Sequence, residues 1–191
     1  TETSTPSVSA GPAYGYYGGG RTTPYHSTVD RIDYGNDTAT ASPKGPLSQS
    51  RGFLAGTGSN SYGYIGGGFQ PGNRSYVDRV DYASDTPTAS PKGSLSGARH
   101  GPFAAGNNSY GYFAGGVSDG PTQLSMIDRI DYANDTATAA VKSTISSSRY
   151  YGGGTGNESF GYFAGGYTGS GNDSTTDRLD YSSDTTTAAP K

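Results

Sequence analysis

The chain has 191 residues, of which 30% are hydrophobic, and a formal net charge of −3 at neutral pH. It has no cysteine, which excludes disulfides, thiol catalysis and cysteine-based metal sites, and its scattered Lys and Arg residues form no basic stripe for nucleic acid. No apolar run approaches the roughly 18 residues of a membrane-spanning helix, so membrane insertion is not expected.

An internal repeat dominates the sequence. An aromatic-Gly-Tyr element begins at Tyr14, Tyr62, Tyr110 and Phe160, and each copy is followed by a Gly-Gly pair. The starts of these elements are 48, 48 and 50 residues apart, so four copies account for nearly the whole chain. We expect one domain of four repeats, with approximate bounds at 1–46, 47–94, 95–144 and 145–191.

Each copy is predicted to form four short strands separated by turn residues. In the second copy these strands cover about 52–55, 62–65, 76–82 and 87–91. In the first copy the first strand covers about 7–13, and the last strand of the fourth copy leads to Lys191. No window has the 3.6-residue apolar period of a helix, so the predicted fold class is all-β.

Four antiparallel strands cannot bury both faces alone, so the copies must stack on one another. We predict a β-propeller of four four-stranded antiparallel blades, closed into a ring because the length is close to four units. The Gly-Gly pair suits a place where backbones crowd or φ is positive. A segment of a larger propeller, a ring completed by two chains and a linear stack of sheets are the alternatives.

An Asp-Arg-x-Asp-Tyr element occurs in every copy, whereas a catalytic site is normally singular. We therefore assign its charged residues to structural ion pairing within a blade or between blades. The following Asp turns, at Asp37 and its equivalents, are expected to bond their own backbone, because they offer too few oxygens for calcium. The structural set is Asp30, Arg31, Asp33, Asp78, Arg79, Asp81, Asp128, Arg129, Asp131, Asp177, Arg178 and Asp180.

The sequence offers no catalytic residues, no metal site and no cofactor motif. His26 and His100 occupy non-equivalent positions, give no zinc signature and are expected to face solvent. The Gly-rich strings lack the Gly-Lys-Ser/Thr ending of a phosphate-binding loop, and no serine hydrolase elbow is present. We therefore expect a protein that is not an enzyme.

The loops between the second and third strands differ most from copy to copy. Equivalent loops of stacked repeats emerge on one face, which is often the binding face, and aromatic side chains beside amides suit sugar rings or protein surfaces. The alternative is that these loops are tolerant surface turns. The candidate ligand-binding residues are Arg21, Tyr25, His26, Phe69, Gln70, Asn73, Arg74, Asp119, Gln123, Tyr167, Asn172 and Asp173.

The order of these elements, with Arg51, Arg99 and Arg149 each preceding the next aromatic-Gly-Tyr element, resembles the kelch repeat. It departs from that pattern in having no Trp. The amino-acid sequence of 27–48 resembles, more specifically, repeats in virion structural proteins of marine cyanophages.

The resemblance implies a virion-associated or extracellular structural or adhesion module. Its expected partners are other virion proteins or a glycan or protein of a host surface, and it is a possible homo-oligomer. An intracellular kelch-type protein-interaction scaffold is the alternative, and a carbohydrate-active enzyme is less favoured.

Overall fold

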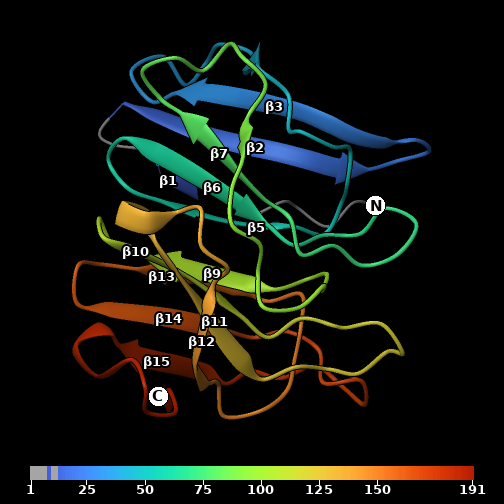
Figure 1. The fold of residues 1–191 in the computed structure, drawn as a ribbon, viewed down its shortest axis with the longest axis vertical. Helices are drawn as coiled ribbons and strands as arrows, with labels where there is room; N and C mark the ends of the chain where they lie inside the picture. Colours follow the sequence, from blue (N-terminus) through green and yellow to red (C-terminus); the bar gives the residue numbers. More distant parts are fainter. Residues whose placement is uncertain (1–7, 10–12) are drawn as a thin grey trace.

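The computed structural model describes residues 8–9 and 13–191 of the chain. The described part forms four antiparallel sheets of four strands each, as the repeat predicted. Within every sheet the strands pair in chain order, and the sheets follow one another as the blades of a four-bladed β-propeller (Figure 1). No helix in the described ranges is long and apolar enough to cross a membrane.

The first two blades contain strands β1 to β8. Blade 1 consists of β1 (Val8–Ser9), β2 (Tyr14–Arg21), β3 (Tyr25–Asp33) and β4 (Ser42–Lys44). Blade 2 consists of β5 (Ala55–Gly58), β6 (Tyr62–Gly66), β7 (Val77–Asp81) and β8 (Ser90–Pro91).

The last two blades contain strands β9 to β16 and two short 3-10 helices, η1 (Tyr132–Asn134) and η2 (Tyr181–Ser183). Blade 3 consists of β9 (Phe103–Gly106), β10 (Tyr110–Ala114), β11 (Met126–Asp131) and β12 (Ala140–Thr144). Blade 4 consists of β13 (Gly153–Gly156), β14 (Phe160–Ala164), β15 (Thr176–Asp180) and β16 (Ala189–Pro190).

The predicted bounds of the first strand of blade 2 were wrong. We expected 52–55 in blade 2, but β5 begins at Ala55, because Arg51 is buried and Phe53 turns the backbone with φ of 60°. The last strand of that blade is also shorter than the predicted 87–91. In blade 1 the strand expected over 7–13 is confirmed at β1, and residues 7 and 10–12 lie outside the described part.

A recurrent set of polar side chains joins each blade to the next, and we call it the interblade clamp. A Tyr, an Arg and a Lys of one blade meet a single Asp in the turn after the third strand of the next blade. In the second clamp the Tyr64 hydroxyl and the Arg79 guanidinium donate to Asp135 Oδ2 at 2.9 and 2.7 Å, and Lys92 lies 3.3 Å from Oδ1. In the first clamp Tyr16, Arg31 and Lys44 contact Asp85. In the second clamp Tyr64, Arg79 and Lys92 contact Asp135. In the third clamp Tyr112, Arg129 and Lys142 contact Asp184.

The interblade clamp corrects the expectation that these turn aspartates bond their own backbone. That role falls instead to the preceding Asp of each repeat, since Asp81 Oδ1 accepts a hydrogen bond from Ala83 N and Asp131 Oδ1 accepts one from Ala133 N. Asp33 and Asp180 bond the turns of blades 1 and 4 in the same way.

The Tyr that follows each third strand explains the Gly of the aromatic-Gly-Tyr element. Tyr132 stacks on Tyr64 of the preceding blade with ring centroids 4.4 Å apart, and its other side covers Gly111 of its own blade. A Cβ on Gly111 would lie 2.6 Å from the Tyr132 hydroxyl oxygen, which is closer than real contacts allow. The same stacking joins Tyr16 to Tyr82 and Tyr112 to Tyr181.

The Gly-Gly pair bends the chain after the second strand in blades 2 to 4, as predicted. Gly67 and Gly68 have φ of 70° and 110°, a region that residues with a Cβ rarely adopt. Gly68 N donates to Arg99 O of the following blade at 2.9 Å, so the bend also places a backbone donor between blades.

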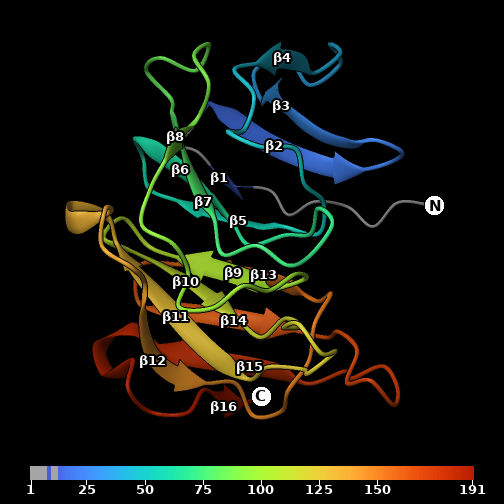
Figure 2. The ribbon, with the colours of Figure 1, turned by 45° about the vertical axis from the view of Figure 1, so that its right-hand side comes forward.

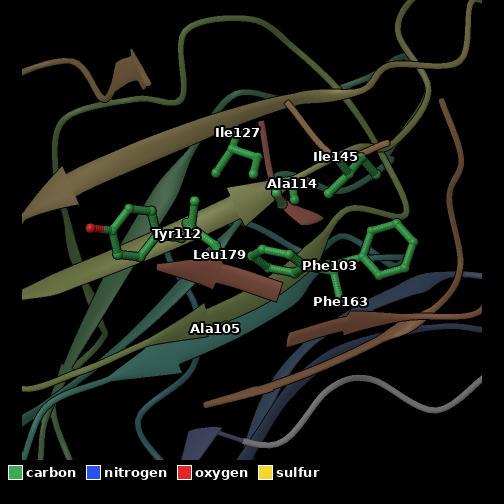
Figure 3. Close-up of a cluster of buried hydrophobic side chains, with 9 residues drawn as sticks. Phe103, Ala105, Tyr112, Ala114, Ile127, Ile145, Phe163 and Leu179 are labelled. Carbon is green, nitrogen blue, oxygen red and sulfur yellow. The ribbon is translucent and has the colours of Figure 1, made fainter. Parts of the chain in front are cut away.

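Apolar side chains fill the three junctions between consecutive blades. Figure 3 shows the cluster between blades 3 and 4, where Tyr112, Ile127 and Ile145 pack with Phe163 and Leu179. Equivalent clusters lie between blades 1 and 2 and between blades 2 and 3. The core is therefore divided into junctions, which is how a chain with so few large aliphatic residues buries them.

The four sheets are arranged as blades, as predicted, but blade 4 and blade 1 share no junction among the described residues that is comparable to the other three. The contacts between first strands run from β1 to β5, from β5 to β9 and from β9 to β13. In both views blade 1 lies at one end of the long axis and blade 4 at the other (Figures 1 and 2).

Inside each of blades 2 to 4 a fully buried Arg meets the first Asp of the Asp-Arg-x-Asp-Tyr element. Arg99 Nη2 lies 2.9 Å from Asp128 Oδ2, and both side chains have no exposed surface. The other two pairs are Arg51 with Asp78 and Arg149 with Asp177. The position equivalent to these arginines in the first copy, Thr3, lies outside the described residues.

We expect Gly111→Ala to lower the free energy of unfolding by about 1–3 kcal/mol, because the new methyl group displaces the Tyr132 ring from its stack. Urea denaturation measures the change. Gly153→Ala is the matched control, since a Cβ there meets nothing within 4 Å. Equal stability of the two variants would contradict the packing described.

We expect Arg99→Met to lower the free energy of unfolding by about 3–5 kcal/mol, because it leaves the buried Asp128 carboxylate without its partner. The double variant Arg99→Met/Asp128→Leu should regain much of that stability, since it removes both charges. Thermal and urea unfolding measure both effects. A double variant no more stable than the single one would show that the ion pair is not the cause.

Candidate functional site

Two sets of loops meet at one end of the propeller. The loops between second and third strands lie beside the connectors that lead from one blade into the next. Gly20 N donates to Arg51 O, and Gly116 N donates to Arg149 O, each at 3.0 Å. These backbone hydrogen bonds join a loop of one blade to the connector that enters the following blade, and they fix both sets in one layer.

Seven aromatic rings from all four blades gather in this layer, and we call them the aromatic cluster. Phe53 lies 5.3 Å from Tyr151 and Phe69 lies 5.6 Å from His100, measured between ring centroids. The Arg21 guanidinium of blade 1 sits 5.4 Å from the Phe53 ring centre, which adds a cation–π contact. The cluster comprises Tyr25, Phe53, Phe69, His100, Tyr150, Tyr151 and Tyr167.

Part of the aromatic cluster faces solvent. Tyr151 and Tyr167 are 41% and 36% exposed, so each ring presents part of its surface to solvent. The other rings of the cluster are partly buried. The cluster therefore offers apolar ring surface with accessible phenol groups.

His100 lies near the middle of the aromatic cluster and is half-buried. Its Nδ1 is 2.7 Å from Asn73 Oδ1, and the Asn73 amide in turn donates to Val117 O at 3.1 Å. Burial lowers the pKa of His100, and this outweighs the opposite effect of the Asp119 charge. The imidazole is therefore neutral at physiological pH, and the expectation that His100 faces solvent was wrong.

The backbone beneath two of the rings is strained. Phe53 and Tyr151 have φ of 60° and 59°, a region that bulky residues seldom occupy. The equivalent position in blade 3 is Gly101, with φ of 63°, and a Cβ there would meet the Tyr151 ring at 2.6 Å. Strain of this kind costs about 1–3 kcal/mol and concentrates at functional sites.

The predicted loop residues divide into two groups. Arg21, Tyr25, Phe69 and Tyr167 lie in or against the aromatic cluster. The other predicted residues that form hydrogen bonds mainly brace the loops: Gln70 to Ser50, Arg74 to Pro71, Asp119 to Asn73 N, Gln123 to Pro121, His26 to Thr22 and Asp173 to Ser147. Asn172 is exposed, and Asn73 is buried.

Hydrogen bonding also fixes the charge of one loop residue. Hydrogen bonds from the Thr175 and Ser147 side chains and from Thr175 N lower the pKa of Asp173 to about 2. Its carboxylate also lies 3.8 Å from Arg149 Nη1, so it belongs to the frame of blade 4.

Four members of the aromatic cluster were missed as site residues because they lie in the connectors. Phe53, His100, Tyr150 and Tyr151 all follow the repeated arginines within two residues. These positions differ from copy to copy just as the loops do, and that variation was the available signal.

The opposite end of the propeller has a polar hollow of about 250 Å³. It is lined by the first strands and following turns of blades 2 to 4, and Asn108 Nδ2 donates to Glu158 Oε1 at 2.7 Å on its rim. Among the described residues no group of three or more His, Asp or Glu side chains could share a metal ion.

No protein-family model matches this sequence, and a search of curated proteins finds no significant relative.

We expect stability to fall as pH decreases below about 6.5, the ordinary pKa of His, because the unfolded chain then takes up a proton that the buried imidazole resists. Above that pH this group contributes no pH dependence. Urea denaturation between about pH 8 and 5 measures the effect. His100→Phe should flatten the profile, whereas the control His26→Gln, at an exposed position, should not; an unchanged slope in His100→Phe would refute the assignment.

Proposed function

We propose that the protein is a non-catalytic adhesion module that binds glycans on its aromatic cluster. The observation that carries this proposal is the exposure of Tyr151 and Tyr167 in a layer to which all four blades contribute. Rigid aromatic rings give contact area at low entropic cost, and their faces suit the apolar faces of sugar rings.

Polar groups beside the rings support a carbohydrate ligand. Arg21 and Asn172 are exposed at the edge of the same layer, where they can form hydrogen bonds with hydroxyl groups. The carboxylates of Asp119 and Asp173 accept hydrogen bonds from Asn73 N and the Ser147 hydroxyl, so both brace loops of the layer. Binding without turnover therefore fits the arrangement better than catalysis.

The resemblance of the repeats to virion structural proteins of cyanophages supports a place on a virus particle or outside the cell. A rigid propeller that displays one recognition layer is suited to attachment to a host surface. Detection of the protein in purified particles tests this location, and its absence from particles would leave an ordinary kelch-type protein scaffold as the better account.

We expect Tyr151→Ala and Tyr167→Ala each to weaken glycan binding at least about tenfold, because each removes a stacking surface worth about 1.4 kcal/mol or more. A glycan array followed by calorimetry measures the change. Tyr34→Ala is the matched control, since Tyr34 is 49% exposed but lies on a turn outside the aromatic cluster. Binding that survives both cluster variants, or binding of proteins alone, would overturn the glycan proposal.

A further inference from the structure

Blade 1 carries half of an interblade clamp. Asp37 occupies the position of Asp85, Asp135 and Asp184, yet it is exposed and forms no hydrogen bond or ion pair with another described residue. Its neighbour Tyr34 is 49% exposed, whereas the equivalent Tyr132 is stacked on the preceding blade.

The same face of blade 1 is apolar around this acidic turn. Ile32 and Ala41 are partly exposed, although the equivalent Val80 and Ala89 of blade 2 are buried at 4% exposure each. This face of blade 1 therefore has the composition of a blade junction with its partner missing among the described residues.

Blade 4 carries the other half of the clamp. Tyr162, Arg178 and Lys191 occupy the positions of Tyr112, Arg129 and Lys142 in the preceding blade. Arg178 lies over the Phe160 ring at 4.6 Å, just as Arg129 lies over Tyr110 at 4.3 Å. Within the described ranges, however, neither Arg178 nor Lys191 reaches an acidic side chain as an ion pair.

The exposure of blade 4 agrees with an unpaired face. Tyr162 is partly exposed, whereas the clamp tyrosines of the other blades are at most 1% exposed. All four residues of β13 are also exposed, whereas β5 and β9 are mostly buried.

We propose that two copies of this chain associate head to tail, with the Tyr162, Arg178 and Lys191 face of one copy closing a clamp on Asp37 of the other. The two faces are complementary in charge, and the three internal clamps already show the geometry of such a contact. The blades that carry the two half-clamps, 1 and 4, lie at opposite ends of the molecule (Figures 1 and 2), which suits contact between copies.

A head-to-tail contact closes into a ring when the rotation between copies allows it, and it otherwise grows into a filament. Two copies would give a ring of eight blades, within the range of about four to eight that propellers use. Thr176 stands where the other blades have Val or Ile, so this junction is less apolar than the internal ones. The association is therefore reversible and depends on concentration.

Light scattering and native mass spectrometry over a range of concentrations test the proposal. Wild-type protein should change from monomer to dimer, or to a longer series, as concentration rises. Asp37→Arg and Arg178→Asp should each weaken association at least about thirtyfold, because each places like charges in the junction. Both residues are outside the buried core, and thermal melts check that the variants fold.

The double variant Asp37→Arg/Arg178→Asp restores an attractive pair between copies and should recover association. Val141→Lys, which adds a charge at a 53% exposed position on β12 of blade 3, is the control and should associate like wild type. A protein that stays monomeric even at about 1 mM overturns the proposal. Association that is unaffected by either single variant, or not recovered in the double variant, also overturns it.

Discussion

The interblade clamp is the interaction on which the rest of the structure depends. A β-blade of this chain has too few large aliphatic residues to hold its neighbour by apolar burial alone. The clamp adds a charge-assisted contact at each junction, where one carboxylate receives a phenol, a guanidinium and an ammonium group. Burial alone would raise the pKa of Asp135, but its hydrogen bond with Tyr64 and the charges of Arg79 and Lys92 outweigh this and lower it. The carboxylate is thus held charged, and hydrogen bonds to charged groups are worth about 1.5–3 kcal/mol each.

The clamp also determines where the molecule can interact with others. Three clamps fix the positions of the four blades relative to one another. Loops and connectors from separate repeats therefore meet in one layer and together form the aromatic cluster. The strained backbone at Phe53 and Tyr151 persists because the surrounding hydrogen bonds define it, including the bond from Gly101 N to Phe53 O. The same repetition leaves one acceptor on blade 1 and one set of donors on blade 4, which is why the ends of the molecule are complementary.

The repeat made the blade count, the strand content and the all-β class predictable, because the same local sequence pattern occurs in each copy. The Gly-Gly bend was predictable for the same reason. The partner of Asp85 was not, since Tyr16 lies 69 residues away and nothing local to the turn points to it. The start of β5 was misplaced because the buried Arg51 looks, in sequence, like an ordinary polar residue before a strand. His100 looked like a loop residue because its burial depends on rings from three other segments of the chain. The sequence also could not distinguish loop residues that hydrogen-bond within the protein from those that face a ligand.

The most direct test of this account is a double-mutant cycle at the second clamp, with Arg79→Met, Asp135→Asn and the two combined, followed by urea denaturation. If the clamp joins the blades, the two changes will be non-additive, with a coupling free energy of about 0.5–3 kcal/mol. Additive effects, with no coupling beyond experimental scatter, would mean that the blades are held together by apolar packing alone and would contradict the central claim.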